Sequence, residues 1–279
     1  MKRKMIRDLY VGRKLADGYP DLEKLGVDWF SRSQLSHSKV EEVMQSLERL
    51  IELSREPKGI LVVGCGPNPH AINQLLSMGY DVSGVEPIAE YVNKAGDFLG
   101  DPKRVVLGSA EKLPLGDHSK RVIIMTSVLE HVDSPLQSLA EAYRVLMPGG
   151  VVYISTTNRW KLSLTGNNGE YRVRFFNWFP DIVKESYVYH HLHFNPSLAN
   201  YTPRPAVHWF SYPDLCKLGR QAGFAQFYSL LDLVNDKSPY VSRSRLRKWL
   251  LKPMQNNVWL RSFALTQAGG TIFMLKRPA

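Results

Sequence analysis

A short glycine turn near residue 64 is the feature of the chain best suited to holding a ligand. Gly64-Cys65-Gly66 comes directly after the apolar run Ile60-Leu61-Val62-Val63 and before a helical pattern. Glycine lets the backbone approach a ligand closely, and a helix N-terminus offers free N–H donors. Because Pro69 takes the place of the third glycine, the dinucleotide-binding pattern is not met. Taken alone, the turn is either a ligand loop or simply a tight turn.

Glu86 adds an acidic group at the end of the next β-rich run. It follows the glycines by about 20 residues, the spacing at which a carboxylate in nucleotide-binding α/β folds accepts hydrogen bonds from ribose hydroxyls. A carboxylate at this position argues against NADP, whose 2′-phosphate it would repel. The alternative is an exposed charge at a strand end.

Short β-rich runs alternate with helical patterns from Ile60 to Thr157, which predicts a mostly parallel sheet covered by helices on both faces. The expected strands are 60–63, 81–86, 105–107, 122–125 and 151–155, followed later by 226–231 and 270–275. The expected helices are 68–78, 88–98, 135–146 and one from about 210 to 224.

We predict a single domain over residues 1–279, although three regions interrupt the alternation. Residues 1–58 form an N-terminal helical segment that ends in an amphipathic helix. Residues 59–157 form the ligand-binding core, and 158–208 an aromatic-rich insertion. The core resumes over 209–279, with a basic insertion at 232–267.

Bulk composition points to a soluble, cytoplasmic protein. The chain is 44% hydrophobic and 22% charged, and its two cysteines exclude a disulfide framework. The basic N-terminus lacks the apolar stretch of a secretory signal, and no run is long enough to span a membrane. The formal net charge of +10 favours anionic partners (nucleic acid, phosphorylated small molecules or acidic lipid), or is incidental to the surface.

Five motifs in register resemble the class I S-adenosylmethionine-dependent methyltransferases of the ubiquinone-biosynthesis and type-11 group. They are Gly64-Cys65-Gly66, Gly84-Val85-Glu86-Pro87, the stretch 108–114, Ser127-Val128-Leu129-Glu130-His131-Val132 and 146–150. The resemblance implies a Rossmann-like sheet of seven strands, mostly parallel with the last antiparallel. It also implies S-adenosyl-L-methionine as methyl donor.

The resemblance further implies which residues hold the donor. The glycine turn would approach its amino-acid part, Glu86 would hold the ribose, and Pro87 would lie beside the adenine. Thr126 would contact the methionine portion, with Ser127 nearby. The residues that would line the adenine edge are Ser109, Ala110 and Glu111.

Several positions depart from the family pattern. Val62 replaces the usual acidic residue before the first glycine, and Asn68 replaces the usual third glycine. Ser109 replaces the family's acidic contact to adenine. Lys120-Arg121 replaces the Phe-Asp pair that usually precedes the fourth strand. These changes predict modest donor affinity, and they leave a non-catalytic relative as an alternative.

Methyl transfer from a sulfonium needs mainly alignment and exclusion of water. A base is required only when the acceptor must lose a proton, and His131 is the candidate; its alternative role is structural. Glu130 with His131 could contribute to a metal site, but no further ligand is evident from spacing, so no metal is predicted.

The insertion at 158–208 lies directly after the fifth strand, where a lid over the acceptor is expected. Its aromatic side chains indicate a hydrophobic acceptor, or alternatively a small core of the insertion's own. His190, His191 and His193 do not suggest zinc, because alternation along a strand would separate the first two. The aromatic residues there and just beyond are Trp160, Tyr171, Phe175, Phe176, Trp178, Phe179, Tyr187, Tyr189, Phe194, Tyr201, Trp209 and Phe210.

The basic insertion contains an amphipathic stretch, 242–252, that would rest on an anionic membrane face, receive a phosphorylated acceptor, or form an ordinary surface helix.

The favoured function is methyl transfer to oxygen of a small, hydrophobic or lipid-linked acceptor. The alternatives are an RNA (tRNA) methyltransferase and a donor-binding protein without activity; a nicotinamide oxidoreductase is a distant fourth.

Overall fold

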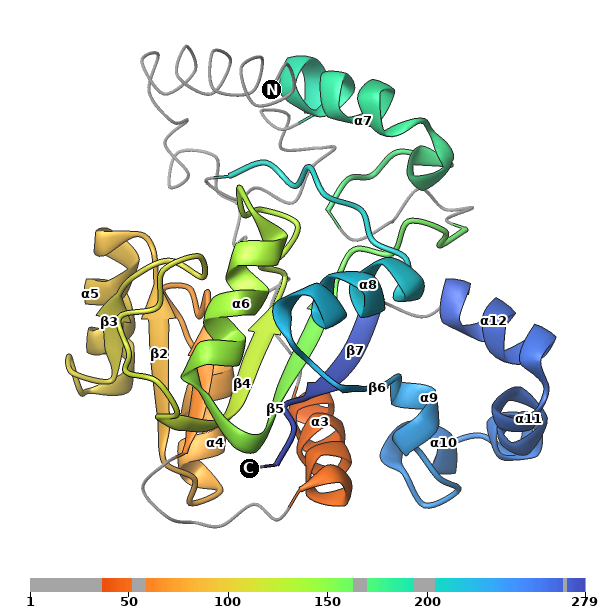
Figure 1. The fold of residues 1–279 in the computed structure, drawn as a ribbon, viewed down its shortest axis with the longest axis horizontal. Helices are drawn as coiled ribbons and strands as arrows, with labels where there is room; N and C mark the ends of the chain where they lie inside the picture. Colours follow the sequence, from red (N-terminus) through yellow and green to blue (C-terminus); the bar gives the residue numbers. More distant parts are fainter. Residues whose placement is uncertain (1–36, 52–58, 163–169, 193–203, 268–269, 279) are drawn as a thin grey trace.

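The computed structural model describes residues 37–51, 59–162, 170–192, 204–267 and 270–278. Seven strands form one sheet in the order β3-β2-β1-β4-β5-β7-β6 (Figure 1). The strands are β1 (Ile60–Val63), β2 (Val82–Glu86), β3 (Val105–Leu107), β4 (Lys120–Thr126), β5 (Leu146–Thr156), β6 (Gln226–Tyr228) and β7 (Gly270–Leu275). The pairs from β3 to β5 are parallel, and β7 runs antiparallel to both of its neighbours.

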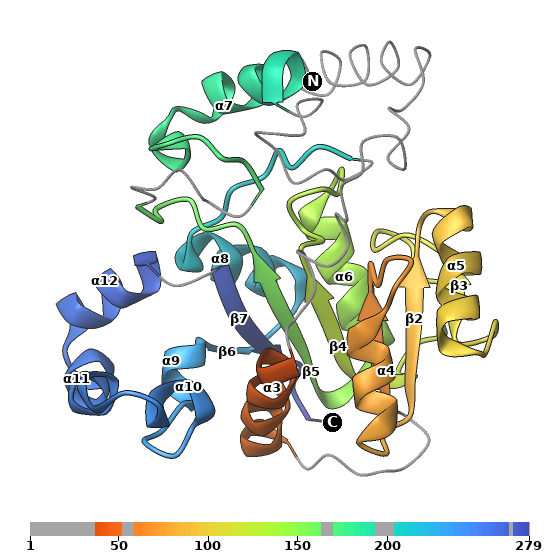
Figure 2. The same cartoon turned by 180° about the vertical axis from the view of Figure 1, so that it is seen from behind.

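Helices cover both faces of the sheet (Figures 1 and 2). The helices that flank the strands are α3 (His37–Leu50), α4 (His70–Ser77), α5 (Ala89–Leu99), α6 (Pro135–Val145) and α8 (Tyr212–Ala222). Smaller helices are η1 (Phe176–Trp178), α7 (Asp181–Tyr187), η2 (Val188–Leu192), α9 (Leu230–Leu233) and α10 (Pro239–Ser242). Two further helices, α11 (Arg245–Asn256) and α12 (Val258–Gln267), precede β7.

Each face of the sheet has its own hydrophobic core. On one face α6 and α8 bury Leu139, Ala142 and Leu215 against the strands. On the other face α3 and α4 bury residues such as Leu47 and Ile72. The strands between these layers are apolar in both directions, as parallel strands covered on two sides must be. This rigid centre fixes the strand ends, where the candidate site lies.

The predicted fold class is confirmed: the sheet has seven strands, is mostly parallel and has an antiparallel last strand. Most predicted boundaries fall within two residues of the observed ones, and two strand boundaries are wrong by three residues or more. β5 begins at Leu146 rather than at 151, because its first residues already pair with the start of β4. β6 ends at Tyr228 rather than at 231, because Ser229 and Asp232 form a capping box that starts α9.

The amphipathic helix at the end of the N-terminal segment is present as α3, with Val40, Val43, Met44 and Leu47 buried. The rest of that segment, 1–36 and 52–58, lies outside the described residues. In the parts of the chain that the structure describes, no helix is both long and apolar enough to cross a bilayer. The division into the four predicted regions stays a prediction.

The described part of the insertion at 158–208 builds a small core of its own. Tyr171, Phe176 and Trp209 are buried there together with residues of η2. Phe175 and Trp178, in contrast, are about half exposed, at 47% and 55%. The insertion's own core is therefore present, whereas the expected role of the exposed aromatic residues as acceptor lining stays a prediction. Phe194, Tyr201 and His193 lie outside the described residues.

Candidate functional site

The glycine turn leaves β1 in a conformation that requires glycine. Gly64 and Gly66 have φ angles of 67° and 68°, in the left-handed region that other residues rarely adopt. The Gly64 amide donates to the Val85 carbonyl at 2.8 Å, so the turn is fixed to the end of β2. The Gly66 amide donates to Oε2 of Glu86 at 2.9 Å. The sequence-predicted turn and acidic residue therefore meet directly.

Glu86 is a buried carboxylate, with only 4% of its surface exposed. Besides the Gly66 amide it accepts the Ile88 amide at 3.3 Å. Burial raises the pKa of Glu86, although both amide donors act to lower it. An ionised carboxylate has about four lone-pair sites, so two hydrogen bonds leave acceptor capacity for ribose hydroxyls.

Cys65, between the two glycines, is not a nucleophile. Burial, with the nearby charge of Glu86, raises the pKa of its thiol to about 12. The reactive form of cysteine is the thiolate, which is scarce at such a pKa. The Cys65 sulfur instead lies close to Gly84, since a Cβ added to that glycine would be 2.9 Å from it.

The predicted adenine-edge residues follow β3. Ala110 is buried and Ser109 half-buried, whereas Pro87 at the end of β2 is exposed. The Glu111 carboxylate accepts the Ser134 amide at 2.7 Å, at the N-terminus of α6. Glu111 therefore joins this loop to α6, and its contact with adenine stays a prediction.

Arg144 on α6 holds the remainder of that loop. It donates to the Leu113 and Leu115 carbonyls at 3.1 and 2.8 Å, and it pairs with Asp117 and Glu141. Charge-assisted hydrogen bonds of this kind are stronger than neutral ones. They position the loop that carries Ser109 and Ala110, a role that local sequence patterns did not indicate.

The end of β4 brings two hydroxyl groups to the same edge of the sheet. The Thr126 hydroxyl oxygen is buried and has no hydrogen-bond partner among the described residues. Ser127 has a φ of 53°, and its amide donates to the Ser155 carbonyl at 2.8 Å. A positive φ at a residue other than glycine is costly and is found mostly at functional sites.

Three titratable side chains gather beside this edge: Glu130, His131 and Glu170. One ligand atom from each lies within 4.8 Å of the others, a grouping that could hold a divalent cation. Glu170 supplies the third ligand that spacing did not reveal. It belongs to the insertion, and no local motif marks it.

Glu130 and His131 have fixed orientations. The Thr156 hydroxyl donates to the Glu130 carboxylate at 2.6 Å. Nδ1 of His131 lies 2.8 Å from the Arg204 carbonyl oxygen, so this nitrogen carries the proton in the neutral ring and the lone pair is on Nε2. Nε2 is 4.0 Å from Oε2 of Glu170.

Burial shifts all three groups toward their neutral forms. It raises the pKa of Glu130 and of Glu170, and for Glu170 the charge of Glu130 adds to the effect. Burial lowers the pKa of His131 to about 4, so its imidazole is neutral at physiological pH. Perturbed groups clustered in this way are typical of functional sites.

The insertion closes over the cluster. The amides of Val207 and His208 donate to the Glu130 carbonyl at 2.9 and 3.3 Å. His208 also contacts the Val132 carbonyl through Nε2 at 2.9 Å. These bonds join the returning end of the insertion to the loop after β4, at the carboxyl edge (Figure 1).

His190 and His191 lie in η2 rather than in a strand, so the expectation that strand alternation separates them is wrong. Both side chains are exposed, and Nδ1 of His190 contacts the Ser186 carbonyl at 2.7 Å. In the described part of the insertion they do not join the buried cluster.

The departures from the family pattern have structural consequences. Val62 is buried in the core on the α3 and α4 face, where a carboxylate would lack water. Lys120 donates to the Ser83 hydroxyl at 2.9 Å, and burial lowers the pKa of its amine. Arg121 donates to the Pro148 carbonyl at 3.2 Å.

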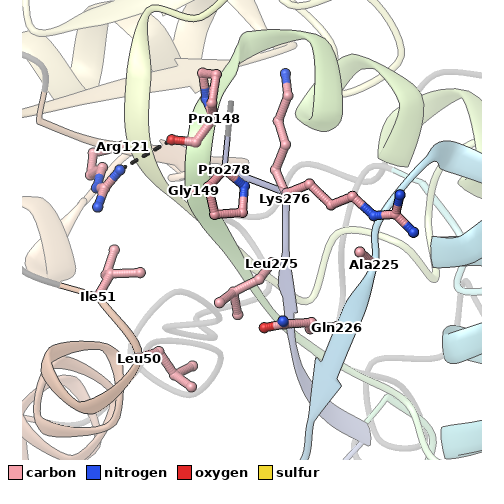
Figure 3. A pocket seen from close by; sticks show the side chains of 11 residues that line it. Leu50, Ile51, Arg121, Pro148, Gly149, Ala225, Gln226, Leu275, Lys276 and Pro278 are labelled. Carbon is pink, nitrogen blue, oxygen red and sulfur yellow. Dashed lines mark hydrogen bonds between the residues drawn. The ribbon is translucent and has the colours of Figure 1, made fainter.

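A cavity of about 570 Å³ lies at the opposite edge of the sheet (Figure 3). Arg121, Pro148 and Leu275 are among the residues that line it. The Lys276 amine donates to the Tyr143 and Leu146 carbonyls, at 2.7 and 2.8 Å. Because Arg121 begins β4 whereas Thr126 ends it, this cavity is separate from the glycine turn.

Topology and strand-end residues together define the chain as a nucleoside-binding α/β protein. A family model described as "Methyltransferase domain" matches residues 61–154. An uncharacterised methyltransferase of Mycobacterium bovis is 38% identical over 107 residues, which cover 37% of this chain and 42% of that protein. One from Schizosaccharomyces pombe is 31% identical over 115 residues, 37% and 41% of the two chains. The match therefore spans about two fifths of these relatives' length.

Solved structures show the same kind of similarity. A methyltransferase of Methanosarcina mazei has a TM-score of 0.49 at 18% identity, covering 84% of this chain and 97% of that one. A possible histamine N-methyltransferase of Thermotoga maritima has a TM-score of 0.47 at 23% identity, covering 74% and 79%. The family model and the relatives, without these structures, identify residues 61–154 as a class I S-adenosylmethionine-dependent methyltransferase domain.

The residues at this edge fit S-adenosylmethionine. The buried Thr126 hydroxyl has acceptor and donor capacity that no described residue uses, and buried polar groups normally find partners. An added Cβ at Gly66 would meet nothing within 4 Å, so the turn has open space beside it. Glu86 offers a carboxylate with acceptor capacity left beside its two amide donors, and its contact with the ribose stays a prediction. With Val62 apolar, the donor's ammonium lacks the family's usual partner.

Alanine at Gly64 is expected to cost more stability than alanine at Gly66. Both substitutions place a side chain at positive φ, which costs about 1–2 kcal/mol. At Gly64 the new Cβ would also lie 2.8 Å from Cγ2 of Val128, whereas at Gly66 it meets nothing. Overpacking adds about 1–3 kcal/mol. Urea unfolding of both variants measures the difference.

The double variant Gly64→Ala/Val128→Ala separates the two contributions. Its free energy of unfolding is compared with that of Val128→Ala alone. This difference should be smaller than the loss that Gly64→Ala causes in the wild type, because the steric contact with Val128 is gone. Equal unfolding free energies for the two single glycine variants would show that Val128 does not restrict the turn.

Replacing Glu170 by glutamine is expected to make the free energy of unfolding depend less on pH. Folding raises the pKa of Glu170 and Glu130, so their contribution is complete below the unfolded value and is lost as pH rises through the folded values. From about pH 6 to about pH 9 the wild type should lose on the order of 1–3 kcal/mol more than Glu170→Gln, since one pKa unit corresponds to about 1.4 kcal/mol. Unfolding is measured in urea with a chelator present.

Glu90→Gln is the matched control, because the Glu90 side chain is 68% exposed and pairs only with Lys94 on the same helix. Its pH dependence should follow the wild type. The contribution of His131, whose folded pKa is lowered, falls only below the ordinary histidine value of about 6.5, so it touches this range near pH 6 alone, and it is present in both proteins. Parallel curves for the wild type and Glu170→Gln would contradict the buried, neutral carboxyl pair.

Proposed function

We propose that the protein transfers the methyl group of S-adenosylmethionine to an oxygen atom of a small hydrophobic or lipid-linked acceptor. The observation that carries this proposal is the cluster of Glu130, His131 and Glu170, in which two buried carboxyls lie beside a half-buried imidazole, directly after Thr126 and Ser127 in the chain and joined by a residue of the insertion. The residues proposed to bind the methyl donor and the residue proposed to accept the proton would thus share one edge of the sheet.

Bound S-adenosylmethionine supplies a methyl group already activated on its sulfonium. Glu86 would hold the ribose of the donor, and Thr126 would contact its methionine portion. A hydroxyl acceptor must lose its proton as the new bond forms. Nε2 of His131 carries the lone pair of the ring when Nδ1–H donates to the Arg204 carbonyl, and burial lowers the pKa of the ring to about 4.

Glu170 and Glu130, which burial keeps in their neutral form, would position the acceptor hydroxyl by hydrogen bonds, and the neutral imidazole of His131 would take up its proton. Both carboxyls are buried, at 8% and 1% exposure, so a proton held by either is shielded from water. Because His131 lies in a closed environment, exclusion of water and alignment supply the remaining acceleration.

The acceptor's apolar character is supported by the exposed aromatic side chains of the insertion. Trp160 and Trp178 form an edge-to-face pair with 6.3 Å between ring centroids, and both are about half exposed. Aromatic side chains that are not needed for the insertion's own core are available to a hydrophobic ligand.

An RNA acceptor is the second candidate, favoured by the formal net charge of +10. An RNA substrate would make activity fall steeply with salt, because binding releases counterions. Activity on a small apolar acceptor would be almost insensitive to salt.

The test is release of S-adenosylhomocysteine by the full chain with three acceptor sets: hydroxylated isoprenoid or aromatic compounds, the matching amines, and bulk tRNA. Salt-insensitive turnover with the hydroxyl compounds supports the proposal. Turnover with the amines alone overturns the assignment to oxygen. Salt-sensitive turnover with tRNA alone favours the second candidate, and donor binding without any turnover favours a non-catalytic protein.

A further inference from the structure

Helices α11 and α12 form a hairpin at the outer flank of the molecule with an unusual number of exposed apolar side chains. In Figures 1 and 2 the pair lies beyond the β6 and β7 edge of the sheet, away from both cores. No residue of α12 is buried. The exposed fractions are 63% for Leu246, 72% for Trp249, 73% for Val258, 85% for Trp259, 42% for Leu260 and 63% for Phe263.

Polar contacts hold this hairpin in place. Arg261 of α12 pairs with Asp232 through two hydrogen bonds, at 2.5 and 2.8 Å. The Gln255 amide donates to the Leu231 and Val234 carbonyls, at 2.8 and 3.0 Å. These polar contacts anchor the hairpin to the α9 region. The exposed aromatic side chains of the hairpin take no part in them and remain accessible to a partner.

Positive charge surrounds the same side chains. The stretch from Lys237 to Gln267 contains seven lysines and arginines and no aspartate or glutamate, so its formal charge is +7, against +10 for the whole chain. Arg245, Lys248 and Lys252 are exposed on α11 beside Trp249. One short segment thus combines most of the net charge with the largest exposed apolar groups.

We propose that the α11–α12 hairpin docks on an anionic lipid bilayer. Tryptophan, phenylalanine and leucine enter the interface between headgroups and acyl chains, while neighbouring arginines and lysines bind anionic headgroups. A nucleic acid would use the charge but not the aliphatic residues Leu246 and Val258. Neither helix is long and apolar enough to span a bilayer, so the contact is at the surface.

The hairpin is joined to the start of the insertion. The Asn158 amide donates to the Leu265 carbonyl at 2.9 Å, and the Leu162 amide to Gln267 at 3.3 Å. Docking would therefore bring the membrane beside the segment that leaves the carboxyl edge of the sheet. Docking itself does not depend on methyl transfer, and the following experiment measures no catalysis.

The experiment is sedimentation of the full-length protein with vesicles of phosphatidylcholine alone or of equal parts phosphatidylcholine and phosphatidylglycerol. We expect binding to the anionic vesicles only. Trp259→Ser/Phe263→Ser should lower the partition coefficient at least ten-fold. Each lysine or arginine reversed in Arg245→Glu/Lys248→Glu should lower it roughly five-fold or more, since a basic residue near an anionic surface contributes about that factor.

Two matched controls keep the result specific. Leu107→Ser removes an apolar side chain that is 56% exposed on β3, at the far edge of the sheet. Lys103→Glu/Lys217→Glu reverses two exposed charges that do not belong to the hairpin. Both controls should bind vesicles as the wild type does, and unchanged melting temperatures show that all variants fold.

Three results would overturn the proposal. The first is no binding of the wild type to either vesicle. The second is binding that the hairpin variants leave unchanged. The third is a wild-type dimer in light scattering that Trp259→Ser/Phe263→Ser converts to a monomer, which would mean that a second copy covers this face.

Discussion

Replacing Glu86 by alanine is expected to weaken binding of S-adenosylhomocysteine by at least ~100-fold. The substitution removes the proposed ribose acceptor, and each hydrogen bond to a charged group contributes about 1.5–3 kcal/mol. It also frees the Gly66 and Ile88 amides, which Glu86 now holds at 2.9 and 3.3 Å. Isothermal calorimetry of the purified variant measures the dissociation constant.

Two further variants distinguish a lost ligand contact from a loosened turn. Glu86→Gln keeps an acceptor oxygen and should lose less affinity than alanine. Glu90→Ala, an exposed carboxylate in the first turn of α5, should bind as the wild type does. An affinity within two-fold of wild type for Glu86→Ala, a factor worth only about 0.4 kcal/mol, would remove Glu86 from the donor site.

Replacing His131 by alanine is expected to lower kcat about 10²–10⁴-fold with a hydroxyl acceptor, the range for loss of a general base. Affinity for S-adenosylhomocysteine should stay near the wild-type value, because the proposed donor contacts come from other residues. The pH profile gives a second readout. Because burial lowers the pKa of His131 to about 4, the acid-side fall of kcat/KM in the wild type should come toward pH 4 rather than near the ordinary histidine value.

The matched control for His131 is His208→Ala. His208 also comes from the closed region of the insertion, and its ring contacts the Val132 carbonyl at 2.9 Å. Its loss should affect stability more than the chemical step. If His131→Ala and His208→Ala lower kcat equally, the role of His131 is to hold the insertion through Arg204.

The sheet was predictable because its strands carry their own signals. Ile60–Val63 is a continuous apolar run that stops at Gly64, and alternating helical patterns require crossovers. Missed boundaries also have physical reasons. The capping box of Ser229 and Asp232 ends β6 early, and Asn257 starts α12 by accepting the Trp259 and Leu260 amides. Both capping signals are present in the sequence, but they lie at the end of a predicted strand and inside a predicted insertion.

The site was only partly predictable, because half of it depends on contacts between distant segments. Gly64, Glu86 and Thr126 end neighbouring strands, so their meeting follows from the parallel order. Glu170 has no such position. It reaches Glu130 and His131 because the insertion returns through Val207 and binds the loop after β4. No local pattern around Glu170 announces that contact, nor the burial that shifts its pKa.

The most direct test of the donor site is a crystal structure of the full chain with S-adenosylhomocysteine. We expect both ribose hydroxyls within hydrogen-bond distance of the Glu86 carboxylate, with the amino-acid part beside Gly64 and Gly66 and near the Thr126 hydroxyl. Density for the ligand in the cavity at Arg121 and Pro148, or none at the glycine turn at saturating ligand, would contradict the assignment.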